Sequence, residues 1–308
     1  MTPHDVRLRE SYRRCRAVCR RSRSNFCPAF FLLPPDRARA MEALYAFLRV
    51  TDDLADAAPG SDRALRRLDG WEAAFQALQT AEGVIPGMPA TEEPLLAEGM
   101  AVLPAAADVV RRYGVPWETL QAVIDGVRMD LQPVRFQTFD HTLDYCRKVA
   151  SAVGVACIHI WGFSGGAEAL AKADACGIAF QLTNILRDLA EDARRDRYYL
   201  PLEEFARFGM APEDLLSGIV NANTAQWLEF QMDRTADFYH LGAELLPHLS
   251  PRGRRIFGLM TTTYWTLFRR LRRFRTELLR ARIRVPGWWI LTLAVRWAVL
   301  PPARRSLP

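Results

Sequence analysis

The sequence predicts an all-α protein. Apolar residues recur at intervals of three and four over long segments, which is the period of an amphipathic helix, and alternating stretches of strand length are absent. Half of the 308 residues are hydrophobic and 25% are charged, a balance typical of globular chains. No segment rich in Pro, Gly or Ser divides the chain, so we expect a single domain over residues 1–308.

Helix breakers separate the expected helices. Pro34-Pro35 precedes the second helix and Pro59-Gly60 ends it, while a loop from Pro86 to Pro94 follows the third. Pro116 suits the first turn of a helix, where its missing N–H is tolerated. The expected helices cover residues 4–20, 36–57, 61–81, 92–112, 116–131, 139–161, 166–193, 221–247 and 251–282.

The basic residues are almost all arginine. Of the 41 basic residues only Lys148 and Lys172 are lysines, and the net charge is +6. Arginine favours planar, bidentate partners such as carboxylate and phosphate, which indicates a phosphorylated ligand, a nucleic acid or an anionic membrane. A high genomic GC content would also raise arginine over lysine. The arginine clusters at 13–23 and 269–284 permit a nucleic-acid or membrane-binding module as a distant alternative.

Two apolar helices each carry one polar stripe with two carboxylates one turn apart. At about 100° per residue, the four members of the first stripe fall within about 60° of one another and those of the second within about 80°. The stripes are Tyr45, Arg49, Asp52 and Asp56 in the first helix, and Gln181, Asn184, Asp188 and Asp192 in the second. A nucleic-acid-binding module has no use for four such aspartates, so we expect no nucleic-acid partner.

The chemistry of these stripes has two interpretations. Carboxylates one turn apart repel each other by roughly 0.2–0.5 kcal/mol, so something must offset the repulsion. A solvated acidic face, paired locally with Arg49 and Arg187, is the simpler interpretation. The other is a Mg²⁺ site, because Mg²⁺ takes hard oxygen ligands and completes its shell with water and substrate phosphates. Two stripes, each beside an arginine, favour Mg²⁺ and a diphosphate whose oxygens Arg49, Arg187 and Arg197 could bind.

Departure of a diphosphate would leave a carbocation that needs an apolar cavity. Small residues are frequent between positions 150 and 180, which indicates either close helix packing or space for a hydrocarbon tunnel. Aromatic side chains could line such a tunnel and stabilise cations through their π faces, with Tyr45, Tyr145, Phe26 and Phe30 as candidates.

These motifs resemble those of the squalene/phytoene synthases, which are head-to-head isoprenyl diphosphate synthases. The resemblance extends from Ser24-Asn25-Phe26 to about residue 284. Besides the two aspartate motifs it includes the segment DYCRKVASAVG at 144–154. The segment RYYLP at 197–201 follows the second motif at the family's distance.

The resemblance implies an isoprenoid synthase helical bundle with a central cavity. Two prenyl diphosphates would bind with Mg²⁺ between the aspartate helices. One would ionise, and its allylic cation would attack the other's double bond to form a cyclopropylcarbinyl diphosphate. The implied Mg²⁺ ligands are Asp52, Asp56, Asp188 and Asp192. The implied contacts of the diphosphate or its metal shell are Arg49, Asn184, Arg187 and Arg197. Tyr45 and Tyr145 would lie by the reacting carbons.

The first functional hypothesis is the Mg²⁺-dependent condensation of two farnesyl diphosphates to presqualene diphosphate or squalene, a precursor for hopanoids or carotenoids. The second is the condensation of two geranylgeranyl diphosphates to phytoene. The depth of the cavity would decide between them. No glycine-rich dinucleotide loop is present, so the sequence does not indicate NADPH, although the family can bind it without such a loop.

The C-terminal segment 286–308 follows an arginine-dense stretch. Its apolar run from Trp288 to Leu300 contains Arg296 and falls short of the roughly 20 residues of a spanning helix. The segment is either a packed helix with its tryptophans in the core or a basic amphipathic tail in a membrane interface. The N-terminal residues are too charged for a secretory signal. We expect a cytoplasmic protein, with peripheral contact at the inner membrane face as the alternative.

Overall fold

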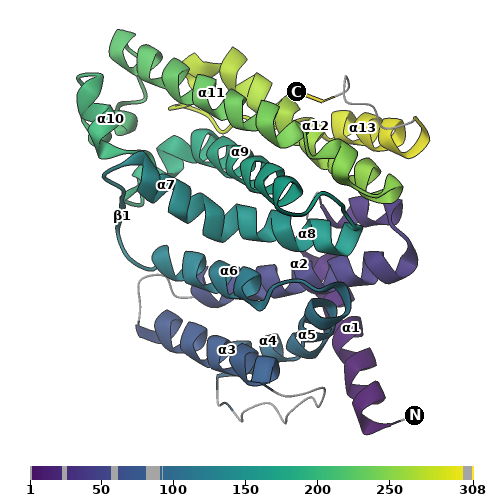
Figure 1. Cartoon of the computed structure of the whole chain (residues 1–308). Helices are drawn as coiled ribbons and strands as arrows, with labels where there is room; N and C mark the ends of the chain where they lie inside the picture. Colours follow the sequence, from purple (N-terminus) through teal and green to yellow (C-terminus); the bar gives the residue numbers. More distant parts are fainter. Residues whose placement is uncertain (1, 23–25, 57–61, 81–90, 92, 301–306) are drawn as a thin grey trace. The chain divides into compact units, whose positions relative to one another are not determined.

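A computed structural model describes residues 2–22, 26–56, 62–80, 91, 93–300 and 307–308 (Figure 1). The motif residues Ser24 and Asn25, the breaker Pro59-Gly60 and most of the loop predicted from Pro86 to Pro94 lie outside these ranges. The described residues are helical almost throughout, so the all-α prediction is confirmed. The central cavity stays a prediction.

Thirteen α-helices lie within the described residues. They are α1 (Pro3–Arg21), α2 (Pro35–Asp56), α3 (Asp62–Thr80), α4 (Pro94–Met100), α5 (Leu103–Tyr113), α6 (Trp117–Met129), α7 (Phe139–Cys146), α8 (Ala152–Trp161), α9 (Gly166–Ala193), α10 (Leu202–Arg207), α11 (Ala222–Ala243), α12 (Pro251–Arg273) and α13 (Gly287–Val299). Short 3-10 helices are η1 (Cys27–Leu32), η3 (Pro212–Ser217), η4 (Leu246–His248) and η5 (Arg275–Glu277), and η2 (Arg147–Ser151) is a π-helical turn.

Two expected helices are interrupted, and the helix expected over 251–282 ends at Arg273 and is followed by η5. The segment expected as one helix over 92–112 forms α4 and α5, and Pro104 lies in the first turn of α5, where a proline is tolerated. The segment expected over 139–161 contains the π turn η2 between α7 and α8. Two-residue strands, β1 (Val134–Arg135) and β2 (Arg197–Tyr198), pair in parallel. Strands this short carry no alternation that a sequence pattern could reveal.

The chain forms two compact units. Unit 1 consists of Met1–Gln132 and Val155–Gly162. Its centre is α2, which packs against α1, α3, α5 and α6. Phe47 of α2 packs between Trp71 and Phe75 of α3, with ring centroids 5.3 Å apart in each pair. This aromatic core holds the inner face of α2 in place.

Unit 2 consists of Pro133–Gly154 and Phe163–Pro308. Its centre is α9, which packs against α7, α11, α12 and η2. Glycines allow the closest approaches: a Cβ on Gly177 would lie 2.5 Å from the Cα of Ser151, and one on Gly242 would lie 2.7 Å from the Cα of Cys176. The small residues noted between 150 and 180 therefore serve close helix packing at Gly177, where backbone fills the space that a tunnel would need.

Candidate active site

The inner face of α2 fixes the orientation of the first aspartate stripe. Thr51 is completely buried, its hydroxyl donates to the carbonyl of Phe47 at 2.9 Å, and it accepts a hydrogen bond from Trp71 Nε1 at 3.0 Å. Leu54 is also completely buried. With these residues inside, the helix turns the stripe away from the core of unit 1.

Asp52 and Asp56 lie on that outward side and are exposed. Many protein atoms nevertheless surround the Asp52 carboxylate. This burial, followed by the negative charge of Asp56, raises the pKa of Asp52 to about 7, while the positive charge of Arg49 lowers it. The pair therefore carries negative charge that the described side chains do not fully compensate. The predicted catalytic residue Tyr45, one turn before Arg49, is half-buried.

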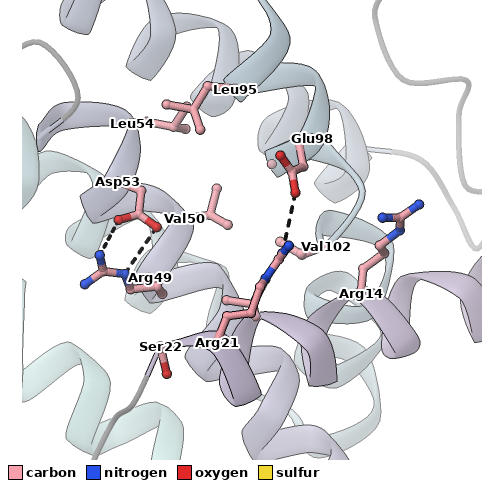
Figure 2. Close-up of a pocket in the computed structure, with 12 residues that line it drawn as sticks. Arg14, Arg21, Ser22, Arg49, Val50, Asp53, Leu54, Leu95, Glu98 and Val102 are labelled. Carbon is pink, nitrogen blue, oxygen red and sulfur yellow. Dashed lines mark hydrogen bonds and ion pairs between the residues drawn. The ribbon is translucent and has the colours of Figure 1, made fainter.

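Arg49 is held by a residue that was not among the predicted site residues. Its Nη2 lies 2.5 Å from Asp53 Oδ1, and its Nε donates to Asp53 Oδ2 at 3.2 Å. Figure 2 shows this pair at the wall of a pocket of about 340 Å³ in unit 1, with the Arg21–Glu98 pair nearby. Contact between Arg49 and a diphosphate stays a prediction.

The second stripe lies on α9, and Asn184 follows Gln181 at its start. Its Nδ2 donates to Gln181 Oε1 at 3.3 Å, and its Oδ1 is buried without a hydrogen-bond partner among the described residues. Tyr264 of α12 lies beside Asn184; burial raises the pKa of Tyr264, and the nearby Arg187 lowers it. An unpartnered buried amide oxygen is an available ligand for a hard cation.

Two arginines hold Asp188. Arg187 Nε donates to Oδ1 at 2.9 Å and its Nη2 to Oδ2 at 2.5 Å. Arg282, which follows η5, lies with its Nε 2.9 Å from Asp188 Oδ1 and its Nη1 3.5 Å from Glu191. Asp188 thus lies between two guanidinium groups, whose remaining N–H donors suit the oxygens of a phosphate.

Asp192 lies one turn further along α9 and lines the same small pocket as Arg197 of β2. Burial, followed by the negative charge of Asp188, raises the pKa of Asp192 to about 7, and Arg197 lowers it. Each stripe thus contains one carboxylate whose pKa is raised to about 7, Asp52 in unit 1 and Asp192 in unit 2.

We expect the Asp192→Asn variant to be more stable than the wild type at neutral pH in metal-free buffer. A carboxylate whose pKa rises from 3.8 to about 7 on folding costs stability that grows as pH rises through that range, because its charged form is disfavoured in the fold. The amide does not titrate. The thermal midpoint should therefore exceed that of the wild type by about 2–4 °C at pH 8. Calorimetry at pH 4.5 should show a smaller gain; an equal gain at both pH values would contradict the explanation.

Tyr145 belongs to an aromatic cluster in unit 2. It is buried on α7, and its ring stacks on that of Tyr199 with centroids 4.8 Å apart and 28° between the planes. Phe136 contacts both rings at 5.7 and 6.0 Å. Tyr199 comes two residues after Arg197, so the motif segment at 197–201 supplies both an arginine beside Asp192 and a support for Tyr145.

Sequence reasoning missed Arg282 and Tyr264. Arg282 is one of many arginines near its position, and nothing in that pattern indicates which of them reaches Asp188. Tyr264 lies in α12, where its ring stacks on Phe180 of α9 with centroids 4.2 Å apart. Both residues meet the second stripe through packing between elements that are distant in the sequence.

The residues present fit Mg²⁺. No group of three or more His, Cys, Asp or Glu side chains that could hold a metal occurs among the residues that the structure describes. Each stripe instead offers two carboxylates, and α9 adds the unpartnered Asn184 Oδ1. A donor set of few, hard oxygens suits Mg²⁺, which keeps waters and shares the phosphates of a substrate.

Comparisons with known proteins agree on one family. The model of the squalene/phytoene synthase family matches residues 19–289. Phytoene synthase 1 of Arabidopsis thaliana is 36% identical over 253 residues, which make up 80% of this chain and 56% of that longer protein. The 15-cis-phytoene synthase of Synechococcus elongatus is 30% identical over 292 residues, 91% of this chain and 90% of that protein.

Solved structures share the fold. The structure of a dehydrosqualene synthase in complex with a ligand matches with a TM-score of 0.80 at 23% identity. The match covers 94% of this chain and 96% of the dehydrosqualene synthase chain. The structure of a squalene synthase from Alicyclobacillus acidocaldarius matches with a TM-score of 0.74 at 24% identity. The match covers 87% of this chain and 95% of the squalene synthase chain. At this identity the likeness concerns the fold alone.

Proposed function

The chain belongs to the squalene/phytoene synthase family of prenyltransferase-type enzymes, and on that premise we propose that it joins two prenyl diphosphates head to head. The observation that carries the proposal is the mixture of groups on α9. Asp188 is held by Arg187 and Arg282, and an unpartnered amide oxygen lies one turn away. Carboxylate and amide oxygens suit a divalent cation, and guanidinium groups suit phosphate oxygens.

We propose that Asp52 and Asp56 of unit 1 and Asp188 and Asp192 of unit 2 hold Mg²⁺. The metal, when bound, neutralises the diphosphate as it leaves. Arg187, Arg197 and Arg282 would bind the diphosphate oxygens, and Arg49 would do so once released from Asp53. To bind Mg²⁺, the carboxylate of Asp188 would have to leave its two arginines. This would cost less free energy when a phosphate takes its place, because the guanidinium groups then keep an anionic partner.

The bond changes follow from the loss of diphosphate. The C–O bond of the first substrate breaks, and both electrons leave with the diphosphate. The double bond of the second substrate attacks the allylic cation, and loss of one proton closes a cyclopropane ring. We propose that the hydroxyl of Tyr145 relays this proton and that the rings of Tyr45 and Tyr145 stabilise the cation.

Two substrate pairs are candidates. The curated relatives described above are phytoene synthases at 30–36% identity, which favours two geranylgeranyl diphosphates over the two farnesyl diphosphates that the sequence motifs placed first. The farnesyl pair is the alternative, because the chain also shares its fold with a squalene synthase and a dehydrosqualene synthase.

The purified full chain, Mg²⁺ and radiolabelled farnesyl or geranylgeranyl diphosphate provide the test. We expect a labelled product with twice the carbon number of its substrate, formed faster from the geranylgeranyl compound. Excess chelator should stop the reaction and added Mg²⁺ should restore it. No consumption of either substrate would refute the proposed condensation, and full activity in chelator would refute the metal assignment.

A further inference from the structure

The C-terminal helix α13 packs on α12 through one face. Leu293 and Trp297 are buried, the ring of Trp297 lies over Gly258 with no room for a Cβ between them, and Trp297 Nε1 donates to Thr262 Oγ1 at 3.0 Å. Arg255 of α12 donates to the carbonyl of Trp297 at 3.0 Å and also to that of Ala298. These contacts fasten α13 to α12, and Trp297 belongs to the core.

The opposite face of α13 is apolar and exposed. Trp288, Leu291, Val295 and Val299 fall within about 80° of one another on a helix, and between 56% and 71% of each residue's surface is exposed. Thr292 lies on the same side, but its hydroxyl donates to the carbonyl of Trp288 at 2.9 Å. A surface helix normally presents polar side chains on this side, so the face requires an apolar cover.

The surroundings of this face are strongly basic. Residues 251–308 contain fourteen arginines and a single acidic residue, Glu277, which gives a formal charge of +13; residues 1–250 therefore carry −7 of the total of +6. Carboxylates of α9 and α11 pair with three of these arginines, Arg272, Arg275 and Arg282, so the remainder of the segment carries the positive charge that is available to a partner. Within the described part of this segment, Arg252, Arg284 and Arg296 are exposed. The cover must therefore be anionic as well as apolar.

We propose that the outer face of α13 docks into the interface of an anionic lipid bilayer. Trp288 and Trp289, stacked with their centroids 5.1 Å apart, would lie at the level of the headgroups, where tryptophan is favoured. The thirteen residues of α13 extend for about 20 Å, less than the roughly 30 Å of a hydrocarbon core, so the helix would lie in the plane of the membrane. No helix within the described residues is long and apolar enough to cross a bilayer.

A second copy of the chain fits this face less well. Two copies meeting there would bring two basic segments together, and this repulsion would oppose the apolar contact. Anionic lipid instead offsets the charge and covers the apolar stripe at the same time. The docking face is independent of the proposed reaction, so each can be tested without the other.

Sedimentation with vesicles tests the proposal. The full chain should sediment with vesicles that contain phosphatidylglycerol, less with vesicles of phosphatidylcholine alone, and less as NaCl is raised. The Leu291→Ser/Val295→Ser double variant should bind the anionic vesicles at least roughly tenfold more weakly, because its apolar contact is lost. Arg284→Gln/Arg296→Gln should reduce the preference for the anionic lipid while retaining the weak binding to phosphatidylcholine.

A matched control separates this face from exposed apolar surface in general. Leu216 and Ile219, also in unit 2, are 51% and 58% exposed, so Leu216→Ser/Ile219→Ser removes similar side chains elsewhere and should bind like the wild type. Circular dichroism melting checks that the variants fold. If the double variant of α13 does not fold, Val299→Ser at the end of the helix replaces it in the binding experiment. The proposal is overturned if the wild type ignores anionic vesicles, if α13 variants bind like the wild type, or if they abolish only self-association.

Discussion

Replacing Asp188 with Asn is expected to slow the consumption of prenyl diphosphate by about 10³-fold. The amide keeps the shape of the side chain but removes the charge that would hold Mg²⁺. It also removes the carboxylate that Arg187 and Arg282 now contact at 2.5–2.9 Å. Asp52→Asn should have a comparable effect, since Asp52 is the equivalent carboxylate of the first stripe. Initial rates at saturating Mg²⁺ measure both losses.

The same helix offers a matched control. Asp174 of α9 is half-buried and forms an ion pair with Arg147 at 3.5 Å, but it lies outside the stripe. Asp174→Asn makes the same chemical change and should keep a rate close to that of the wild type. If Asp174→Asn and Asp188→Asn lost activity equally, the loss would reflect damage to α9, and the metal-binding role of Asp188 would have to be abandoned.

Replacing Tyr145 with Phe is expected to slow turnover by about 10²-fold with little change in KM. The ring remains to stack on Tyr199 at 4.8 Å, so the variant loses only the hydroxyl that we propose to move the proton. Because this step follows ionisation, diphosphate formation within a single turnover should be affected less than product formation. Parallel assays of released diphosphate and labelled hydrocarbon measure the two.

Tyr145→Ala provides the second half of this experiment. If only the π face mattered, Phe would be nearly as active as Tyr, whereas Ala would be poor. Ala also removes the stacking partner of Tyr199, so its thermal midpoint should be compared with that of the wild type. A folded Tyr145→Ala variant with a normal rate and a normal product would place Tyr145 outside the reaction.

Helix prediction succeeded where a long periodic segment had clear ends. The helix expected over 166–193 has those bounds in the structure, because Gly165 adopts a positive φ of 93° before it and the periodic pattern ends at Ala193. Helix prediction failed where contacts between distant segments change the local backbone. The π turn η2 (Arg147–Ser151) lies where the chain approaches the backbone of α9 at Gly177. A periodic pattern does not encode such a contact between distant segments.

The sequence by itself determined the helical class, the family resemblance and the two stripes, because these depend on residue types at fixed spacing along one helix. The tertiary structure alone decided which charged groups from distant segments meet. Arg282 reaches Asp188 from 94 residues away. It also decided that Trp297 is buried while Trp288 is exposed. Contacts between distant segments depend on how the helices pack. Many arginines of this chain lie in similar local sequence, so only the packing decides which of them meets a given carboxylate.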